Sequence, residues 1–481
     1  MSDQAKDDVY LCVIEHKDEP HPRGYKSGTS IDELVKWAED KNHPAKSQKP
    51  DTKPPEDKVP SLGTLMNNIA YTGNHQNELI SLTSAVRSSF PMTMFGAEVA
   101  EPVFSGKEPE RTGENFRIGK IEKAQIPTVI ASMDKINRLG DGLNHLPNAI
   151  FLSLIATFDS QMSDIVRAML SIKSDRLKFS ARQVPLAKIM SASSIDEIVQ
   201  EQIIEEVYLF SRGSHDEQVA FIEDNFTIEI RASWKRWPEF IEIFERRNLV
   251  AHGERRYTKR YVDICTNHKF KDADKNLGEV VKLSHSYMTS SLSILSEFAI
   301  LTIFMLWRKH VPTEKDKCFD AINEVAFNCI TSHQSRLASR LCEFALSLKN
   351  SGVKEAPRLR LVVNLASAFM HLDDDTEATK VLGREDWSAT SDDFQISVAA
   401  LRKDVDEVNR LLPMIKAAGR LSASEFRIWP VFNFIKDDLS FQTKYEEVYG
   451  EKLIIAPTGI AIAEQASADE NDAAVDLGTV H

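Results

Sequence analysis

The stretch FLSLIATFDSQMSDIVRAM, residues 151–169, decides the fold class of this chain. Its apolar side chains recur at steps of three and four residues, and Ser, Thr, Asp and Arg side chains fill most positions between them. A helix of about 3.6 residues per turn gathers such positions into one apolar stripe. The segment therefore predicts a long amphipathic helix whose stripe packs against other helices.

Three further segments are predicted to supply the partner helices. These segments are residues 193–207, 237–252 and 280–307. Each has a helix start signal or an apolar periodicity, and each is long enough for several helical turns. Strand patterns are scarce between them. Four helices of this kind favour an all-α bundle, which we place at residues 135–310.

The N-terminal side of this bundle divides into three parts. Residues 1–42 are expected to form a small element, with one strand in VYLCVIEH and one helix that Ser30 caps. Residues 43–60 contain five prolines and few apolar residues, which predicts a disordered linker. Residues 61–134 are expected to be mixed, helical up to about residue 95 and then a loop or a pair of short strands.

The C-terminal side changes to shorter helices paired by tight turns, over residues 311–455. Aligning Ala378 with Val408 gives a spacing of thirty, close to the period of helical-hairpin repeats such as tetratricopeptide arrays. Two adjacent helical hairpins without repeat ancestry are the alternative interpretation of these two imperfect copies. Residues 456–481 contain acidic side chains among alanines and no Lys or Arg, which predicts a disordered acidic tail.

The charge balance restricts the classes of function. Lys and Arg number 59 and Asp and Glu 72, so the formal net charge is -13. Such an acidic chain is unlike proteins that coat nucleic acid, and any site for an anion must be local. The apolar fraction of 42% and the charged fraction of 27% are ordinary for a globular protein.

The cysteines and apolar runs indicate the compartment. The five cysteines are widely spread and contain no Cys-x-x-Cys pair, so we expect reduced thiols in the core. The first ten residues lack a basic segment followed by an apolar run, so no secretory signal is expected. The most apolar run, residues 298–307, has about half of the roughly 20 residues that a bilayer requires. We therefore expect a buried helix, no membrane association and a cytoplasmic protein.

Several familiar catalytic signatures fail on inspection. GENFRIGK, residues 113–120, has five rather than four residues between its glycines, and Ile121 stands where a phosphate-binding loop needs Ser or Thr. The sequence has no His-Glu-x-x-His, no calcium-binding loop and no Gly-x-Ser-x-Gly. We therefore expect no bound metal and no cofactor.

One segment stands out by its charge, WKRWPEFIEIFERRNLVAHGERRYTKR at residues 234–260. Residues 231–260 carry nine basic and four acidic side chains, a net of +5 in a chain of -13. Its first half has an apolar helical face, and Gly253 follows His252 where a helix stop is expected. Arg247 and His252 lie about 140° apart around such a helix and share a broad flank. The segment predicts a local anion site.

The motif RNLVAH resembles the HEPN superfamily of all-helical domains, whose ribonucleases carry Arg, a polar residue, a short run and then His. Arg247, Asn248 and His252 fit that pattern. Arg246 with His252 and Arg138 with His145 fit the bare spacing too. The polar Asn, the glycine stop, the basic flank and the long helices on either side single out Arg247, and the resemblance covers residues 135–310.

The resemblance implies a metal-independent endoribonuclease that acts on RNA as a homodimer. Arg247 would clamp the scissile phosphate, Asn248 would orient the site, and His252 would transfer protons as the 2′-oxygen attacks. The product would be a cyclic phosphate. Neighbouring phosphates and bases would contact the flanking residues, which are Arg246, Arg255, Arg256, Lys259, Arg260 and Tyr257. Family members often act as toxins or in anti-phage defence, and the hairpins at residues 311–455 would bind a protein partner.

The same residues have structural interpretations. His252 is also a suitable C-terminal residue for a helix, because the helix dipole favours a cation there. Arg246 and Arg247 have Glu242 and Glu245 within pairing distance on the same helix, and the basic run is also typical of an exposed loop. Two alternative functions therefore remain, a catalytically silent helical scaffold and a protein that binds RNA or a nucleotide without turnover.

Overall fold

The computed structural model describes most of the chain, namely residues 10–14, 24–28, 59–104, 111–112, 117–118, 120–179, 183–271, 273–348 and 352–453. The chain divides into two compact units, Met1–Val59 and Pro60–His481. The helix expected after Ser30, the linker up to residue 58 and the tail at residues 456–481 lie outside the described residues.

The described residues of the first unit form an antiparallel pair of strands. Strand β1 (Tyr10–Ile14) pairs with β2 (Gly24–Gly28), with Tyr10 opposite Gly28. The strand predicted in VYLCVIEH is confirmed. Its partner, GYKSG, was not predicted because two glycines and a lysine interrupt any apolar alternation there.

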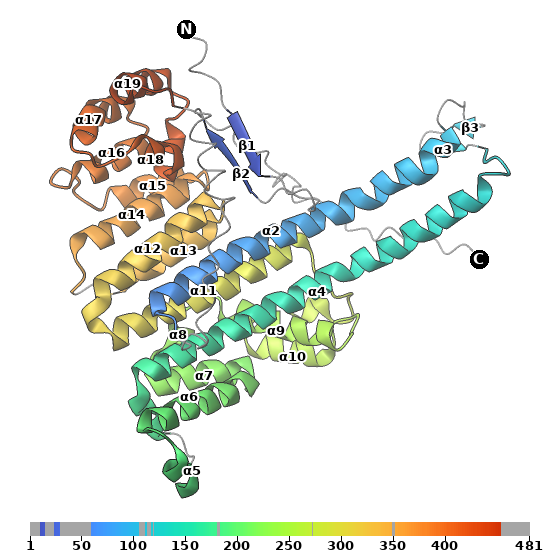
Figure 1. Cartoon of the computed structure of the whole chain (residues 1–481), viewed down its shortest axis with the longest axis horizontal. Helices are drawn as coiled ribbons and strands as arrows, with labels where there is room; N and C mark the ends of the chain where they lie inside the picture. The colour runs from blue at the N-terminus through green and yellow to red at the C-terminus, as the bar shows by residue number, and fades with distance from the viewer. Residues whose placement is uncertain are drawn as a thin grey trace. The chain divides into compact units, whose positions relative to one another are not determined.

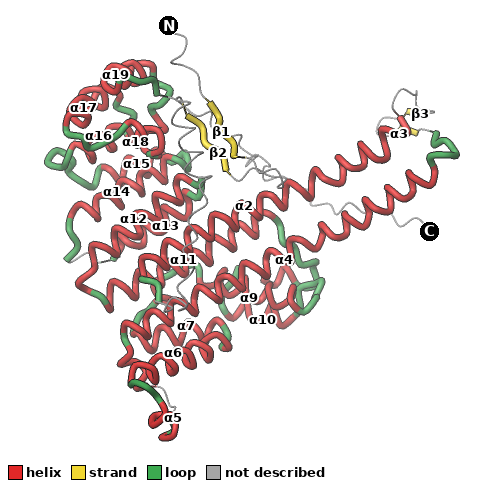
Figure 2. Tube along the Cα trace, viewed as in Figure 1, coloured by secondary structure: helices red, strands yellow, loops and turns green. Residues whose placement is uncertain are grey.

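Helices form almost all of the regular structure of the second unit (Figure 2), so the predicted all-α class is confirmed. Its N-terminal part comprises α2 (Leu62–Phe95), a π-helix (Gly96–Ala100), α3 (Glu101–Phe104), the strands β3 (Arg111–Thr112) and β4 (Arg117–Ile118), and α4 (Ile126–Ile172). Its middle part comprises η3 (Ser174–Phe179), α5 (Leu186–Ser191), α6 (Ile195–Arg212), α7 (His215–Phe226), α8 (Ile230–Ser233), α9 (Trp237–Ala251), α10 (Lys259–Asn267), η4 (Ala273–Asn276) and α11 (His285–His310).

Helix α11 is the central element of this unit. It packs against α2, α4, α9, α12 and α13 (Figure 1). Its apolar residues face every direction, as expected for a helix that other helices surround. The prediction of a buried helix at residues 298–307 is confirmed. By length and composition α4 and α11 are both apolar enough to cross a membrane, although 78% of the α11 window and 39% of the α4 window are buried inside the protein.

Helix α4 is longer than predicted. The sequence showed a clear period only from about Pro147, and the domain boundary at residues 134/135 falls inside this one continuous helix. Gly140, Gly142 and Pro147 weaken helix propensity locally. The extension persists because α2 and its continuation pack along it, and Val129 and Ile136 are buried there among the side chains of Val99 and Val103.

Helix α11 begins later than predicted, at His285 rather than at Val280. The hydroxyl of Ser284 accepts a hydrogen bond from the N–H of Tyr287 and caps the helix. Val280 instead pairs in an isolated β-bridge with Arg256. The residues between α9 and α11 therefore fold back as a compact segment rather than as part of either helix.

The C-terminal part, in its described residues, consists of consecutive helices that pack on their neighbours along the chain. Its elements are η5 (Pro312–Glu314), α12 (Lys315–Thr331), α13 (Ser335–Ser347), α14 (Glu355–Met370), α15 (Asp375–Leu382), α16 (Asp392–Leu401), α17 (Val405–Ala417), α18 (Ala423–Ile428), η6 (Pro430–Phe434) and α19 (Leu439–Tyr449). Ala378 of α15 and Val408 of α17 are both buried. Asp374 and Asp404 cap these helices in the same way, at the same spacing of thirty residues, and the preceding Asp373 and Lys403 share a φ of 58°.

Four of the five cysteines lie in the described core. Cys265, Cys318, Cys329 and Cys342 are buried and free, as predicted. The side chain of Cys12 lies outside the described residues.

Candidate functional site

Helix α9 carries the RNLVAH motif at its C-terminal end. Its inner face buries Phe240, Ile243 and Phe244 where α9 packs against α4 and α11, and Leu249 packs with Tyr257, Tyr261 and Cys265 instead. The N–H of His252 donates to the carbonyl of Asn248, and Gly253 follows with a φ of 71°. This left-handed conformation ends the helix, as the glycine predicted.

Arg246 does not belong to an RNA-binding surface, which corrects the prediction. Only 8% of it is exposed, and its guanidinium pairs with the Glu242 carboxylate at 2.7 Å. It also donates to the carbonyl of Lys282 and lies 3.6 Å from the ring centre of Tyr287. The segment between α9 and α11 folds over this side of α9 and removes Arg246 from solvent.

Tyr257 is also unsuited to stacking on a base, because it is only 6% exposed. Its ring packs against Tyr261, 4.8 Å away between centroids. The hydroxyls of Tyr261 and Tyr287 donate to the Glu242 carboxylate at 2.6 and 2.8 Å. Burial, followed by the Glu242 charge, raises the pKa of Tyr261. This network holds the segment after the motif against α9.

The other predicted RNA-binding side chains are on the surface. Arg255, Arg256, Lys259 and Arg260 are all exposed. Arg256 donates to the carbonyl of Gly278 at 2.7 Å. Burial raises the pKa of Glu245 on α9, and the Arg260 charge opposes this rise.

Arg247, Asn248 and His252 have different surroundings at the end of α9. The Asn248 amide lies 3.4 Å from the Glu245 carboxylate, and His252 is exposed at the helix end. Arg247 is half-buried, and its Nε is inaccessible to solvent without a hydrogen-bond partner. Within the part of the chain that the structure describes, no hydrogen bond or ion pair joins Arg247 to His252. The three residues are neighbours at one helix end, and the hydrogen bond between His252 and Asn248 described above joins their backbones rather than their side chains.

The structure adds a pair that the sequence did not reveal. His215, the first residue of α7, lies with its Nε2 2.8 Å from Oδ1 of Asp159 on α4. The imidazole stacks on Phe244, with ring centroids 3.4 Å apart and an interplanar angle of 14°. Burial lowers the pKa of His215, the Asp159 carboxylate opposes this, and the Arg247 charge lowers it further. Because 56 residues separate Asp159 from His215, no local pattern could pair them.

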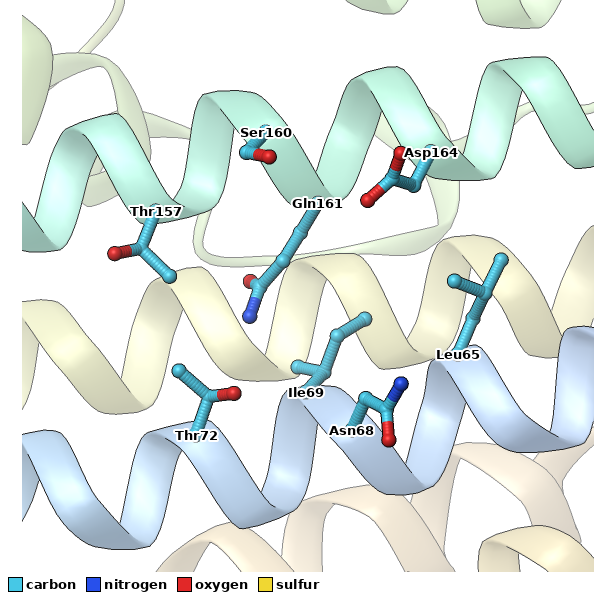
Figure 3. A pocket seen from close by; sticks show the side chains of 8 residues that line it. All are labelled: Leu65, Asn68, Ile69, Thr72, Thr157, Ser160, Gln161 and Asp164. Atoms are coloured by element: carbon cyan, nitrogen blue, oxygen red, sulfur yellow. The ribbon is translucent and has the colours of Figure 1, made fainter. Parts of the chain in front are cut away.

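The seam between α2 and α4 contains a separate hollow of about 190 Å³ (Figure 3). Four of its lining residues come from α2 and four from α4, namely Leu65, Asn68, Ile69, Thr72, Thr157, Ser160, Gln161 and Asp164. Amides, hydroxyls and one carboxylate supply its polar atoms, and none of these lining residues is cationic. It is therefore not an anion site.

No protein-family profile, curated protein or solved structure matches this chain. Among the described residues, no group of three or more His, Cys, Asp or Glu side chains is placed to hold a metal ion. The site must be interpreted from its own residues.

Proposed function

We propose that this chain is a HEPN-type endoribonuclease that cleaves RNA without a metal ion, with Arg247, Asn248 and His252 at its centre. The observation that carries the proposal is the guanidinium of Arg247, which is half-buried and has no hydrogen-bond partner for its buried Nε. A buried charge without a partner is costly. A phosphodiester supplies two anionic oxygens that a planar guanidinium can bind through two parallel hydrogen bonds.

The surface around Arg247 supports this proposal. Four exposed cations, Arg255, Arg256, Lys259 and Arg260, follow the motif and lie on the segment anchored through Glu242. Contacts of this kind to a nucleic-acid backbone are sensitive to salt. We therefore propose RNA as the ligand, despite the net charge of -13 for the chain as a whole.

The proposed reaction is attack of a ribose 2′-oxygen on the adjoining phosphorus, with loss of the 5′-oxygen. Arg247 would stabilise the charge on the phosphoryl oxygens. His252, exposed at the helix end, would donate a proton to the leaving 5′-oxygen. The products are a 2′,3′-cyclic phosphate and a 5′-hydroxyl.

The wider setting is proposed on the family resemblance. Two copies of the chain would bring their motifs to one cleft, and the cytoplasm would be the site of action. The hairpin array α12 to α19 would bind the partner protein or the trigger of a toxin or anti-phage effector. The buried, regular packing of that array also favours the second candidate function, a helical scaffold without catalysis.

The test is incubation of purified protein with mixed tRNA and mRNA in EDTA, comparing wild type with Arg247→Ala and His252→Ala. Arg410→Ala, an exposed cation paired with Glu407 on α17, is the matched control. We expect cyclic-phosphate ends from wild type and the control, and a loss of about 10²-fold or more in both site variants. Intact RNA with wild type would exclude catalysis. Salt-dependent RNA affinity without cleavage would then support binding alone, and no affinity would support the scaffold.

A further inference from the structure

Asp159 and His215 form a polarised pair at the junction of three helices. The imidazole Nε2 lies 2.8 Å from the Asp159 oxygen, and the His215 side chain is 10% exposed while that of Asp159 is 37% exposed. Asp159 comes from α4 and His215 from the start of α7, and the Phe244 ring of α9 fixes the plane of the imidazole. The pair is therefore rigid and lies at the edge of the core rather than within it.

The partner of Nε2 determines the tautomer of His215. A carboxylate only accepts hydrogen bonds, so Nε2 must carry the proton that it donates to Asp159. In the neutral imidazole, Nδ1 then holds a lone pair. Nδ1 has no hydrogen-bond partner within the described part of the chain. The Asp159 carboxylate therefore orients the imidazole through Nε2, and Nδ1 can accept a proton.

Arg247 lies close to this pair. It follows Phe244 by three residues on α9, so both side chains project from the same side of the helix. The His215 ring stacks on Phe244, and the Arg247 charge lowers the pKa of that imidazole, as expected of a neighbouring cation. His252 leaves the same helix about 140° further round and is exposed. Arg247 is thus flanked by two histidines, one held by a carboxylate and one at the surface.

We infer that His215, held by Asp159, accepts the proton of the ribose 2′-hydroxyl whose adjoining phosphate is bound by Arg247. This inference rests on the proposed ribonuclease function and adds a second imidazole to it. As the 2′-oxygen forms its bond to phosphorus, its proton moves to Nδ1 of His215. The bond from phosphorus to the 5′-oxygen breaks, and His252 donates the proton that this oxygen gains. After the reaction His215 has gained a proton and His252 has lost one. Proton exchange with water returns both side chains to their starting states.

The charged groups around His215 act on the pKa of its imidazole in opposite directions. Asp159 on α4 favours the imidazolium, and Arg247 on α9 disfavours it. On its own helix, Asp216 pairs with Arg231, and Glu217 accepts from Ser214. A bound phosphate would neutralise Arg247 and leave Asp159 to stabilise the charged imidazole, so substrate binding makes His215 a stronger base.

The experiment compares full-length wild type with His215→Gln, Asp159→Asn and His252→Ala, using RNA in EDTA under single-turnover conditions. Asp164→Asn, a half-buried aspartate on the same helix, is the matched control. Each protein cleaves a normal RNA and an RNA whose scissile 5′-oxygen is replaced by sulfur, a leaving group that needs no protonation. We expect all three site variants to lose about 10²-fold or more on normal RNA. The sulfur substrate should restore His252→Ala and leave His215→Gln slow.

The pH dependence separates a chemical role from a structural one. Replacing the Asp159 carboxylate by an amide removes support for the imidazolium, so the acid limb of the cleavage rate should move to lower pH in Asp159→Asn. A merely structural pair would lower the rate without moving that limb. If His215→Gln does not fold, as judged by circular dichroism, the Asp159→Asn profile decides.

Two outcomes overturn the inference. In the first, wild type cleaves RNA, and His215→Gln is either unimpaired or restored by the sulfur substrate as fully as His252→Ala. That result would show that His215 takes no part in the reaction, and the ribonuclease function would still stand. Absence of cleavage by wild type on both RNAs would instead reject the ribonuclease function, and this inference with it.

Discussion

The indole N–H of Trp234 donates to Oε1 of Glu297 at 2.7 Å, which joins the start of the motif region to the central helix α11. The other oxygen of Glu297 accepts from Arg236 at 3.1 Å and from Arg340 of α13 at 3.4 Å. Only 4% of the Glu297 side chain is exposed. One buried carboxylate therefore connects the helical bundle to the first hairpin of the C-terminal part.

Glu297→Ala should lower the free energy of unfolding by about 3–5 kcal/mol, because it leaves a mostly buried Arg236 without its partner. Chemical denaturation followed by circular dichroism measures the loss. Glu447→Ala is the control, since that exposed carboxylate pairs with the nearby Lys444 on the protein surface and its loss should cost under about 1 kcal/mol. Equal effects of the two substitutions would show that the Glu297 connection does not stabilise the fold.

The adjacent arginines of the motif should respond in opposite ways. Arg246→Ala should destabilise the protein by about 3–5 kcal/mol, because Glu242 would remain buried with an unpaired charge. Arg247→Ala should change stability by under about 1 kcal/mol, because its buried Nε has no partner to lose. Thermal unfolding and RNA affinity, measured on both variants, check this contrast. A large loss of stability in Arg247→Ala would mean that Arg247 is a structural residue.

Stability should fall as the pH drops below about 6.5. Burial lowers the pKa values of His215, His310 and His371 in the folded protein. The unfolded chain therefore binds more protons in this range, so the free energy of unfolding rises with pH. The His contribution is fully present above pH 6.5 and is lost as the pH falls through the folded values. His215→Gln should flatten the slope of the denaturation midpoint between pH 7 and 5.5, and an unchanged slope would contradict this assignment.

The buried thiols should resist chemical modification. Burial raises the pKa of Cys265 and of Cys329 to about 12 and also raises the pKa values of Cys318 and Cys342. Because the thiolate is the reactive form, all four should be inert at pH 8 in the native protein. A Cys12→Ser variant, titrated with an aromatic disulfide reagent, should show four reactive thiols only after denaturation. Rapid reaction of the folded variant would show that the core opens readily.

The helical class and several boundaries follow from local patterns. The stripe at residues 151–169 required a helix with partners, and the run at residues 298–307 required burial on all sides. The Ser194 side chain caps α6 by accepting a backbone hydrogen bond at the start of the helix. Gly253 ends α9 because glycine readily adopts a positive φ. Capping and periodicity are properties of a few consecutive residues, so the sequence alone shows them.

The tertiary structure gives two neighbouring arginines different surroundings. Arg246 and Arg247 are adjacent and chemically alike, yet the first is buried against Glu242 whereas the buried Nε of the second has no hydrogen-bond partner. The N-terminal half of α4 is helical because α2 packs along it, against the local preference of two glycines and a proline.

The candidate site also depends partly on local sequence and partly on tertiary packing. The sequence by itself determined the helical class, the RNLVAH helix end and the basic segment that follows it, because each depends on neighbouring residues. Only the tertiary structure placed Asp159 and His215 beside Arg247, because this placement depends on how α4, α7 and α9 pack together. Packing between distant segments is a global property of the chain, and no short stretch of sequence contains it.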